Sequence, residues 1–188
     1  MKKFILLLSI ILLANNAFAY DVPKNEEYYK SQIQNQRFLY NATGLIGALQ
    51  KNNSEVVDYF MKAGFDPNTT YIGLPITFYA IKVGDMKSLE SMLKHGANPN
   101  ATASGTNLLL WAIRYKSSES VKLLADNGAD VNKEYMGNLP LNKAISSKQI
   151  KIVETLLQAG ATPNEKTWKM VDKSKDEYLK DLFADIKR

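Results

Sequence analysis

The sequence has no cysteine and only one histidine, His95, among its 188 residues. Without cysteine the chain can form no disulfide, no Cys–His nucleophilic pair and no lipid-modified N-terminal cysteine. Structural zinc sites need several cysteine or histidine ligands, so they are excluded as well. The fold must therefore be stabilised by packing alone.

Sequence motifs of catalysis are also missing. The chain contains no Gly-x-Ser-x-Gly, phosphate-loop or dinucleotide-loop pattern. His95 directly precedes Gly96 at the expected end of a helix, where a cation interacts favourably with the helix dipole, so a structural role is favoured over a catalytic one. Carboxylate pairs such as Asp66 and Asp85 are too common on charged surfaces to indicate a hydrolase. We therefore predict a protein that is not an enzyme and that uses no cofactor or metal.

Charge of one sign is not concentrated along the chain. The 24 Lys and Arg residues outnumber the 19 Asp and Glu residues, but basic and acidic residues alternate. Nucleic-acid-binding proteins usually gather their basic residues in one patch or run. The sequence therefore does not favour a nucleic acid as the partner.

Long apolar runs are scarce, and the most apolar segment lies at the N-terminus. Lys2 and Lys3 precede the almost wholly apolar residues 4–14, and Ala17 and Ala19 provide the small residues that a signal peptidase reads. This pattern predicts a signal peptide over residues 1–19 with cleavage after Ala19. The alternative is an uncleaved membrane anchor, but eleven apolar residues span only about half of a ~30 Å hydrocarbon layer.

Cleavage at that site would leave residues 20–188, which contain no second apolar run long enough to cross a bilayer. We expect a mature chain that does not insert into a membrane and is monomeric. The expected location is the periplasm, with secretion into the medium as the alternative.

A repeat of 32 residues organises the rest of the chain. Four short segments that begin with glycine and end with asparagine recur at this interval, at residues 64–68, 96–100, 128–132 and 160–164. Alanines 48, 80, 112 and 144 keep the same step, each sixteen residues before one of those glycines. A fixed period of this length is typical of stacked helical or solenoid repeats.

Each unit has the pattern of two short helices and a loop. In the unit that begins at Gly105, residues 108–113 form a compact apolar run of about two turns. Residues 119–126 are amphipathic, because their apolar side chains recur at three- and four-residue spacings. Gly128 then ends the second helix, because glycine adopts the left-handed conformation that closes a last turn, and an extended loop follows.

The pattern resembles the ankyrin repeat, whose typical ending Gly-Ala-Asp-Val-Asn stands at residues 128–132. The usual start is degenerate here: only Pro140 keeps the family's proline, and the family's histidine is missing. Because that histidine usually ties neighbouring repeats by hydrogen bonds, its loss implies more apolar packing between repeats. The resemblance implies an all-α helix-turn-helix solenoid of four repeats, over residues 41–72, 73–104, 105–136 and 137–168. A capping segment over residues 20–40 and a helical cap over residues 169–188 would cover the two ends.

The resemblance also implies a binding surface, because loop tips and inner helices of such proteins line a concave groove that holds a protein partner. Carried over by position, the candidate binding residues are Tyr71, Ile72, Lys82, Arg114, Tyr115, Tyr135 and Met136. Tyrosine, methionine and arginine are enriched in interface cores, although each of these side chains could equally pack on its own neighbours. Trp111 and Tyr79 directly precede the repeated alanine and are expected to serve packing. The partner could be an exported toxic enzyme that the protein inhibits; the alternatives are a structural or stress-related envelope scaffold and a secreted effector that binds host proteins.

Overall fold

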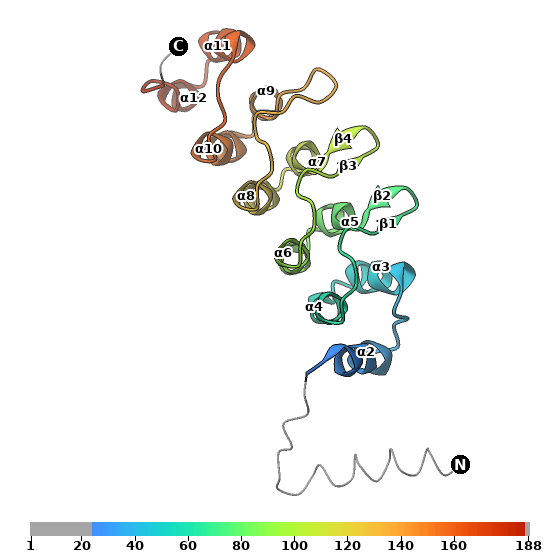
Figure 1. Cartoon of the computed structure of the whole chain (residues 1–188). Helices are drawn as coiled ribbons and strands as arrows, with labels where there is room; N and C mark the ends of the chain where they lie inside the picture. Colours follow the sequence, from blue (N-terminus) through green and yellow to red (C-terminus); the bar gives the residue numbers. More distant parts are fainter. Residues whose placement is uncertain (1–23, 187–188) are drawn as a thin grey trace, which may run out of the picture.

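The computed structural model describes residues 24–186, which form a single stack of helices in two rows (Figure 1). The signal peptide predicted for residues 1–19 lies outside the described residues. Neighbouring helices of one row pack side by side, and each helix of the inner row also packs on the helix of the outer row that follows it. The architecture is thus the helix-turn-helix solenoid expected from the 32-residue period.

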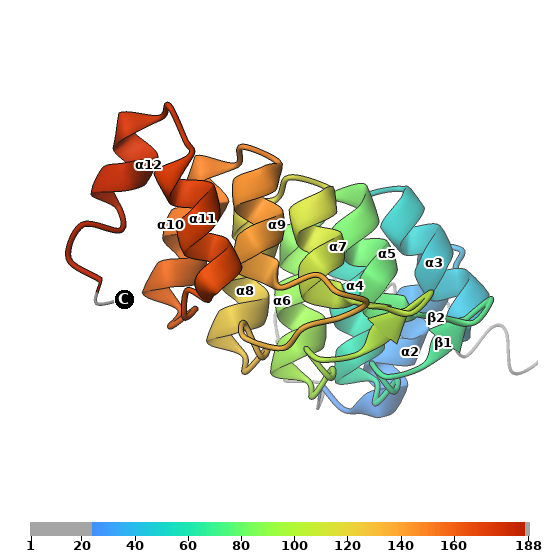
Figure 2. The same ribbon diagram turned by 90° about the horizontal axis from the view of Figure 1, so that it is seen from above.

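The inner row contains α3 (Ala42–Gln50), α5 (Ile76–Val83), α7 (Leu108–Arg114), α9 (Pro140–Ser146) and α11 (Glu165–Asp172). The outer row contains α4 (Ser54–Lys62), α6 (Met86–Lys94), α8 (Ser118–Asp126), α10 (Ile150–Gln158) and α12 (Glu177–Asp181). The N-terminal helix α2 (Glu26–Asn35) packs on α4. Figure 2 shows the same stack from above, with the rows running from α2 to α12.

Local sequence signals set the ends of these helices. Asn107 caps α7 by accepting a hydrogen bond from the backbone of Leu110, and Ser117 caps α8 in the same way from Ser120. Gly128 follows α8 with a φ of 89°, in the left-handed region that closes a helix and that suits glycine. Helix boundaries therefore repeat with the sequence period.

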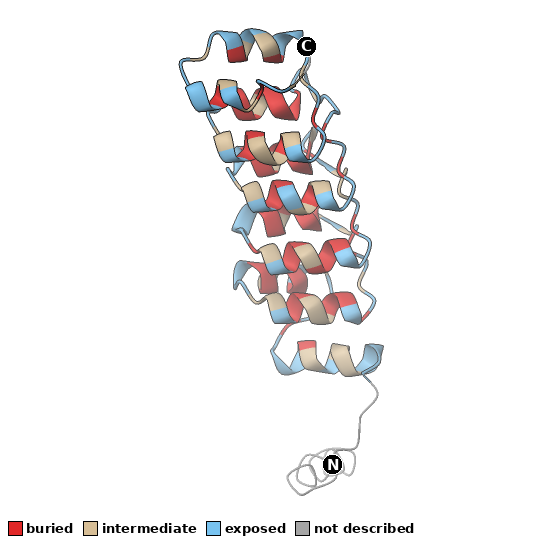
Figure 3. Cartoon of the chain, turned by 90° about the vertical axis from the view of Figure 1, so that its left-hand side faces the viewer, coloured by how far each residue is buried: buried red, intermediate tan, exposed pale blue. Residues whose placement is uncertain are grey.

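The core lies between the two rows, where burial is continuous along the stack (Figure 3). The repeated alanines Ala48, Ala80, Ala112 and Ala144 are all 0% exposed. A methyl group at this position allows the neighbouring helices to approach closely, and a larger side chain would force them apart. The alanine column is therefore a packing requirement of the stack.

Short β-hairpins stand where the sequence suggested extended loops. β1 (Thr70–Tyr71) pairs antiparallel with β2 (Leu74–Pro75), and β3 (Thr102–Ala103) pairs antiparallel with β4 (Thr106–Asn107). A third connection keeps only an isolated bridge between Tyr135 and Asn138. The two central residues of each turn have positive φ angles, which is the type I′ geometry that suits the twist of two-residue hairpins. The all-α class expected from the sequence thus carries small β elements at its edge.

Asparagine side chains tie neighbouring repeats together through their loops. Nδ2 of Asn100 donates to the carbonyl of Gly128 at 3.0 Å, and Oδ1 of Asn100 accepts from the backbone N of Asp130 at 2.8 Å. Asn68 and Asn132 make the same pair of bonds one repeat away on either side. The missing family histidine had suggested more apolar packing between repeats, but these amides also supply polar ties.

Both ends of the stack are closed by helices. Ile33 of α2 is fully buried, and Phe38 is largely buried after it. At the other end α11 follows Asn164 directly, because the side chain of Asn164 caps that helix through the backbone N of Thr167 instead of bridging to a further repeat. The boundary expected at residue 168 falls inside α11, so the C-terminal capping pair begins at Glu165.

Candidate protein-binding face

The hairpin tips present apolar side chains to solvent. Ile72 is 81% exposed and Met136 is 79% exposed, although both are large apolar residues. Each occupies the first central position of its turn, as Ser104 does in the hairpin between them. The sulfur of Met136 lies over Gly105, which brings the third connection against the tip of the second hairpin.

The backbone at these tips is strained for the residues that occupy it. The φ angles of Ile72, Ser104 and Met136 are 50°, 51° and 49°. A β-branched residue such as Ile72 rarely adopts this region, which costs an L-residue roughly 1–2 kcal/mol and which asparagine or glycine would fill with less strain. The side chain of Ile72 is 81% exposed, so it contributes little to the core.

A cluster of aromatic side chains lies on the inner helices next to these hairpins. The ring of Trp111 packs edge-on against Phe78 of the preceding repeat, with centroids 5.1 Å apart, and stacks with Tyr115 at 5.8 Å. The guanidinium carbon of Arg114 lies 5.0 Å from the centre of the Trp111 ring, which is a cation–π geometry. Tyr115 remains 39% exposed and Arg114 is exposed, so the cluster is accessible from solvent.

Two hydrogen bonds fix the hairpins to this cluster. Nε1 of Trp111 donates to the carbonyl oxygen of Ala103 at 2.9 Å. The hydroxyl of Tyr79 donates to the carbonyl oxygen of Tyr71 at the same distance, one repeat earlier. Burial, with a smaller contribution from Tyr71, raises the pKa of Tyr79, which keeps its hydroxyl protonated as a donor.

The structure brings some of the predicted binding residues together and leaves others separate. Arg114 and Tyr115 surround Trp111, and Tyr71 packs against Tyr79 with centroids 5.9 Å apart. Tyr135 lies half-buried with the Lys133 ammonium 5.4 Å from its ring centre. Lys82 is exposed near the end of α5, and among residues 24–186 it forms no salt bridge. The role of these residues in binding stays a prediction.

The sequence pattern predicts packing roles for Trp111 and Tyr79 and indicates no role for Phe78. Both predicted packing residues do pack, but they are only partly buried, and Trp111 forms the centre of the exposed cluster. A signal for this existed in the sequence, because aromatic residues occupy the position before the repeated alanine in two consecutive repeats. We use the term inner-face cluster for Tyr71, Phe78, Tyr79, Trp111, Arg114 and Tyr115.

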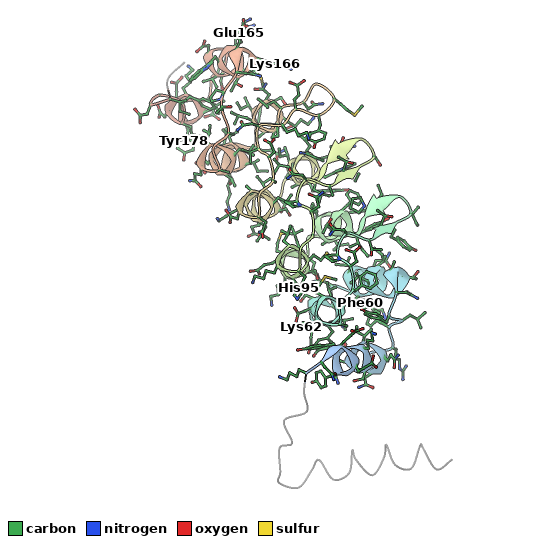
Figure 4. The ribbon with its side chains drawn as sticks, in the orientation of Figure 1. Phe60, Lys62, His95, Glu165, Lys166 and Tyr178 are labelled. Carbon is green, nitrogen blue, oxygen red and sulfur yellow. The ribbon has the colours of Figure 1, made fainter. Side chains whose placement is uncertain are left out.

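His95 lies on the opposite side of the stack from the hairpins, at the end of the outer helix α6 (Figure 4). Its Nδ1 is 2.8 Å from the carbonyl oxygen of Ser91, one turn back in the same helix. Within the described part of the chain, no three His, Asp or Glu side chains form a group that could hold a metal ion. His95 therefore lies at the C-terminal end of α6 and contacts the backbone of the same helix.

A row of short helix pairs with hairpins at one edge and a rigid, partly exposed aromatic cluster defines a repeat scaffold for binding other proteins. The family model for ankyrin repeats in three copies matches residues 45–135 and 77–167, which together cover more than half of the chain. The protein therefore belongs to the ankyrin-repeat family. A comparison with curated proteins gave no match. Among residues 24–186, no helix has the length and apolar character needed to cross a membrane.

Proposed function

We propose that this protein is an exported scaffold that holds one protein partner on the face formed by its hairpin tips and inner-face cluster. The observation that carries the proposal is the placement of exposed Ile72 and Met136 at strained turn positions beside an aromatic cluster centred on Trp111. Interface energy concentrates in a few aromatic and arginine anchors surrounded by apolar contacts.

The cluster is suited to binding because it is already ordered. Trp111 is held by its hydrogen bond to Ala103. Arg114 and Tyr115, three and four residues later in the chain, pack on the ring of Trp111. Side chains that are fixed before binding lose less conformational entropy on association, so a larger part of the contact energy appears as affinity.

The role that best fits an exported, rigid scaffold without catalytic motifs is inhibition of an exported toxic enzyme, as an immunity factor would provide. An inhibitor needs one tightly bound partner in a fixed ratio. An envelope scaffold would instead hold several weakly bound components, and an effector would be recovered from the medium.

The test begins with the protein exported from cells, whose N-terminal residue is expected to be Tyr20. Affinity capture of this form should return one stoichiometric partner, and calorimetric titration then gives its affinity for variants. The combined change Arg114→Glu, Tyr115→Ala and Tyr135→Ala should weaken binding by several powers of ten, since anchors of this kind contribute about 2 kcal/mol or more each.

A control variant makes one charge reversal and one tyrosine truncation of the same kinds away from the proposed face. Lys151→Glu combined with Tyr178→Ala removes an exposed lysine charge of α10 and an exposed tyrosine of α12. This control should bind like the parent protein. If the control loses affinity while the variant changed at Arg114, Tyr115 and Tyr135 keeps it, the partner binds to the outer row and the proposal is wrong.

A further inference from the structure

A second candidate site lies at the C-terminal end of the stack, apart from the inner-face cluster. Here the end of α9, the start of α10 and the capping helices α11 and α12 line an open pocket of about 690 Å³. Ile145, Ile150, Met170 and Leu179 supply its apolar lining. This volume lies within the range of pockets that bind ligands or anchor side chains.

Lysines from three separate parts of the chain line the same pocket. Lys148 lies in the turn between α9 and α10, and Lys175 lies in the turn between α11 and α12. Lys166, Lys169 and Lys173 follow one face of α11 at helical spacing, and Lys166 is labelled in Figure 4. Five lysines therefore line a single pocket.

Carboxylates of the chain itself neutralise little of this charge. Lys169 pairs with Glu165, but among residues 24–186 the other four lysines form no salt bridge. Within the part of the chain that the structure describes, Asp176 is the only acidic residue that lines the pocket, and its Oδ1 accepts a hydrogen bond from the backbone N of Leu179 as the cap of α12. The pocket therefore has a net positive rim that an anionic partner would neutralise.

Helix electrostatics explains only part of this arrangement. Lys169 and Lys173 lie at the C-terminal end of α11, where cations interact favourably with the helix dipole. Lys166 lies in the first turn of α11, where the same dipole disfavours a cation. Lys148 has a φ of 54°, and the corresponding turns one, two and three repeats earlier carry Lys116, Gly84 and Asn52. A lysine at position 166 or at position 148 is therefore unfavourable for the stability of the fold by itself.

We propose that this pocket binds a short acidic segment of a protein partner, in which an apolar side chain enters the pocket and flanking Asp or Glu residues meet the lysines. The charge distribution favours this occupant over an acyl chain, because the five lysines come from several places along the chain, from the turn before α10 to the turn before α12, while a fatty acid carries charge at one end only. The inference does not depend on the inner-face cluster being a binding surface.

The probe is a fluorescein-labelled peptide of repeated Glu-Leu-Asp-Phe units, whose binding to the purified mature chain is followed by fluorescence anisotropy. One comparison peptide replaces the acids by Gln and Asn, and another replaces Leu and Phe by Ser. The parent peptide should bind best, and its affinity should fall with rising salt because exposed charge pairs are screened. Equal binding of the parent and the uncharged peptide would overturn the proposal.

Protein variants locate the binding in the pocket. Lys148→Asn combined with Lys173→Gln should lower the affinity for the parent peptide roughly tenfold, because two exposed charge contacts are lost. The matched control, Lys116→Asn combined with Lys87→Gln, makes the same changes at the equivalent turn one repeat earlier and on α6, and should leave the affinity unchanged. Because asparagine tolerates the left-handed conformation of this turn, Lys148→Asn should not lower the melting temperature, and thermal melting of the double variant checks that lost binding does not come from unfolding.

A vesicle assay separates the remaining source of anionic apolar groups. Any binding of phosphatidylglycerol vesicles should be equally strong for the parent protein and for the variant with Lys148→Asn and Lys173→Gln. If the vesicles bind the parent protein more strongly than that variant and the acidic peptide does not bind, the pocket recognises lipid and the proposal is wrong. Equal loss of peptide affinity in the pocket variant and its control would also overturn it, because binding would then reflect net charge alone.

Discussion

Nε1 of Trp111 donates a 2.9 Å hydrogen bond to the carbonyl oxygen of Ala103, and this bond joins an inner helix to the hairpin that precedes it. The same donor position is filled by the hydroxyl of Tyr79, which bonds to Tyr71 in the preceding repeat. Different side chains thus perform the same task at equivalent places, and each holds a strained hairpin tip at a fixed position relative to the helices.

Replacing Trp111 by Phe removes this donor and keeps an aromatic ring in the cluster. We expect a loss of at least about 1 kcal/mol in the free energy of unfolding, measured by urea denaturation, because the variant loses the hydrogen bond and part of the ring that packs on its neighbours. Tyr79→Phe should cost a similar amount. If neither variant shifts the urea midpoint, the two bonds do not hold the hairpins.

Ile72→Asn and Met136→Asn should each stabilise the fold while weakening partner binding. Asparagine suits the first central position of a type I′ turn, so relief of strain should raise the free energy of unfolding by up to about 1 kcal/mol. The matched control is Ser104→Asn, which relieves the same backbone strain in the middle hairpin but removes no apolar tip. Thermal melting and titration with the captured partner check both effects. A stabilised Ile72→Asn variant with unchanged affinity would mean that the tips do not contact the partner.

Asn100→Ala should destabilise the stack by about 1 kcal/mol or more, because it removes the hydrogen bonds to Gly128 and Asp130 that link two repeats. Asn100→Asp keeps an acceptor for the Asp130 amide but turns a carboxylate oxygen toward the carbonyl oxygen of Gly128, so two acceptors face each other and this variant should also be destabilised. Hydrogen exchange of the Asp130 amide would report the loss locally. Unchanged protection in Asn100→Ala would show that water replaces the amide at no cost.

Ala112→Glu should unfold the central repeats. Ala112 is completely buried where the inner helices meet, so a glutamate there adds volume to a close-packed site and buries an unpaired carboxylate. Circular dichroism should show loss of helix at room temperature. Gly128→Val is the comparison: Gly128 has open space for a side chain and only its left-handed backbone opposes valine, so this variant should stay folded with a lowered melting temperature.

The stability of the protein should fall between pH 10 and pH 12 in part because of Tyr59. A hydrogen bond from its hydroxyl to Glu55 and, secondarily, burial raise the pKa of Tyr59 from 10.0 to about 12. A group whose pKa is higher in the folded state contributes its full stability below its unfolded pKa and loses it as the pH rises through the folded value. Ultraviolet titration of tyrosinate should therefore show one fewer late-ionising tyrosine in Tyr59→Phe than in the parent protein. In Glu55→Gln, Tyr59 should ionise earlier, and an unaltered titration in that variant would contradict the assignment.

The repeat architecture could be predicted because its determinants are local and recur. Helix ends depend on capping residues such as Asn107 and on glycines such as Gly128, and these act within a few residues of their own position. The buried alanines could be predicted because they recur with the same period, and every inner helix needs a small residue there to approach its neighbour closely. The hairpins could not be read with the same ease, because Ile72 and Met136 are poor residues for the turn that they occupy.

The sequence by itself determined the period, the two-helix unit and the positions that form the core, because each of these depends on side chains close together along the chain. Only the tertiary structure decided which residues of different repeats meet. Phe78 packs against Trp111 of the next repeat, and Lys148 shares a pocket with Lys173 at the end of the capping helix α11. The first contact depends on the offset between stacked helices, and the second depends on α11 beginning directly after Asn164 without a hairpin. Neither feature can be read from the residue spacing within a single repeat.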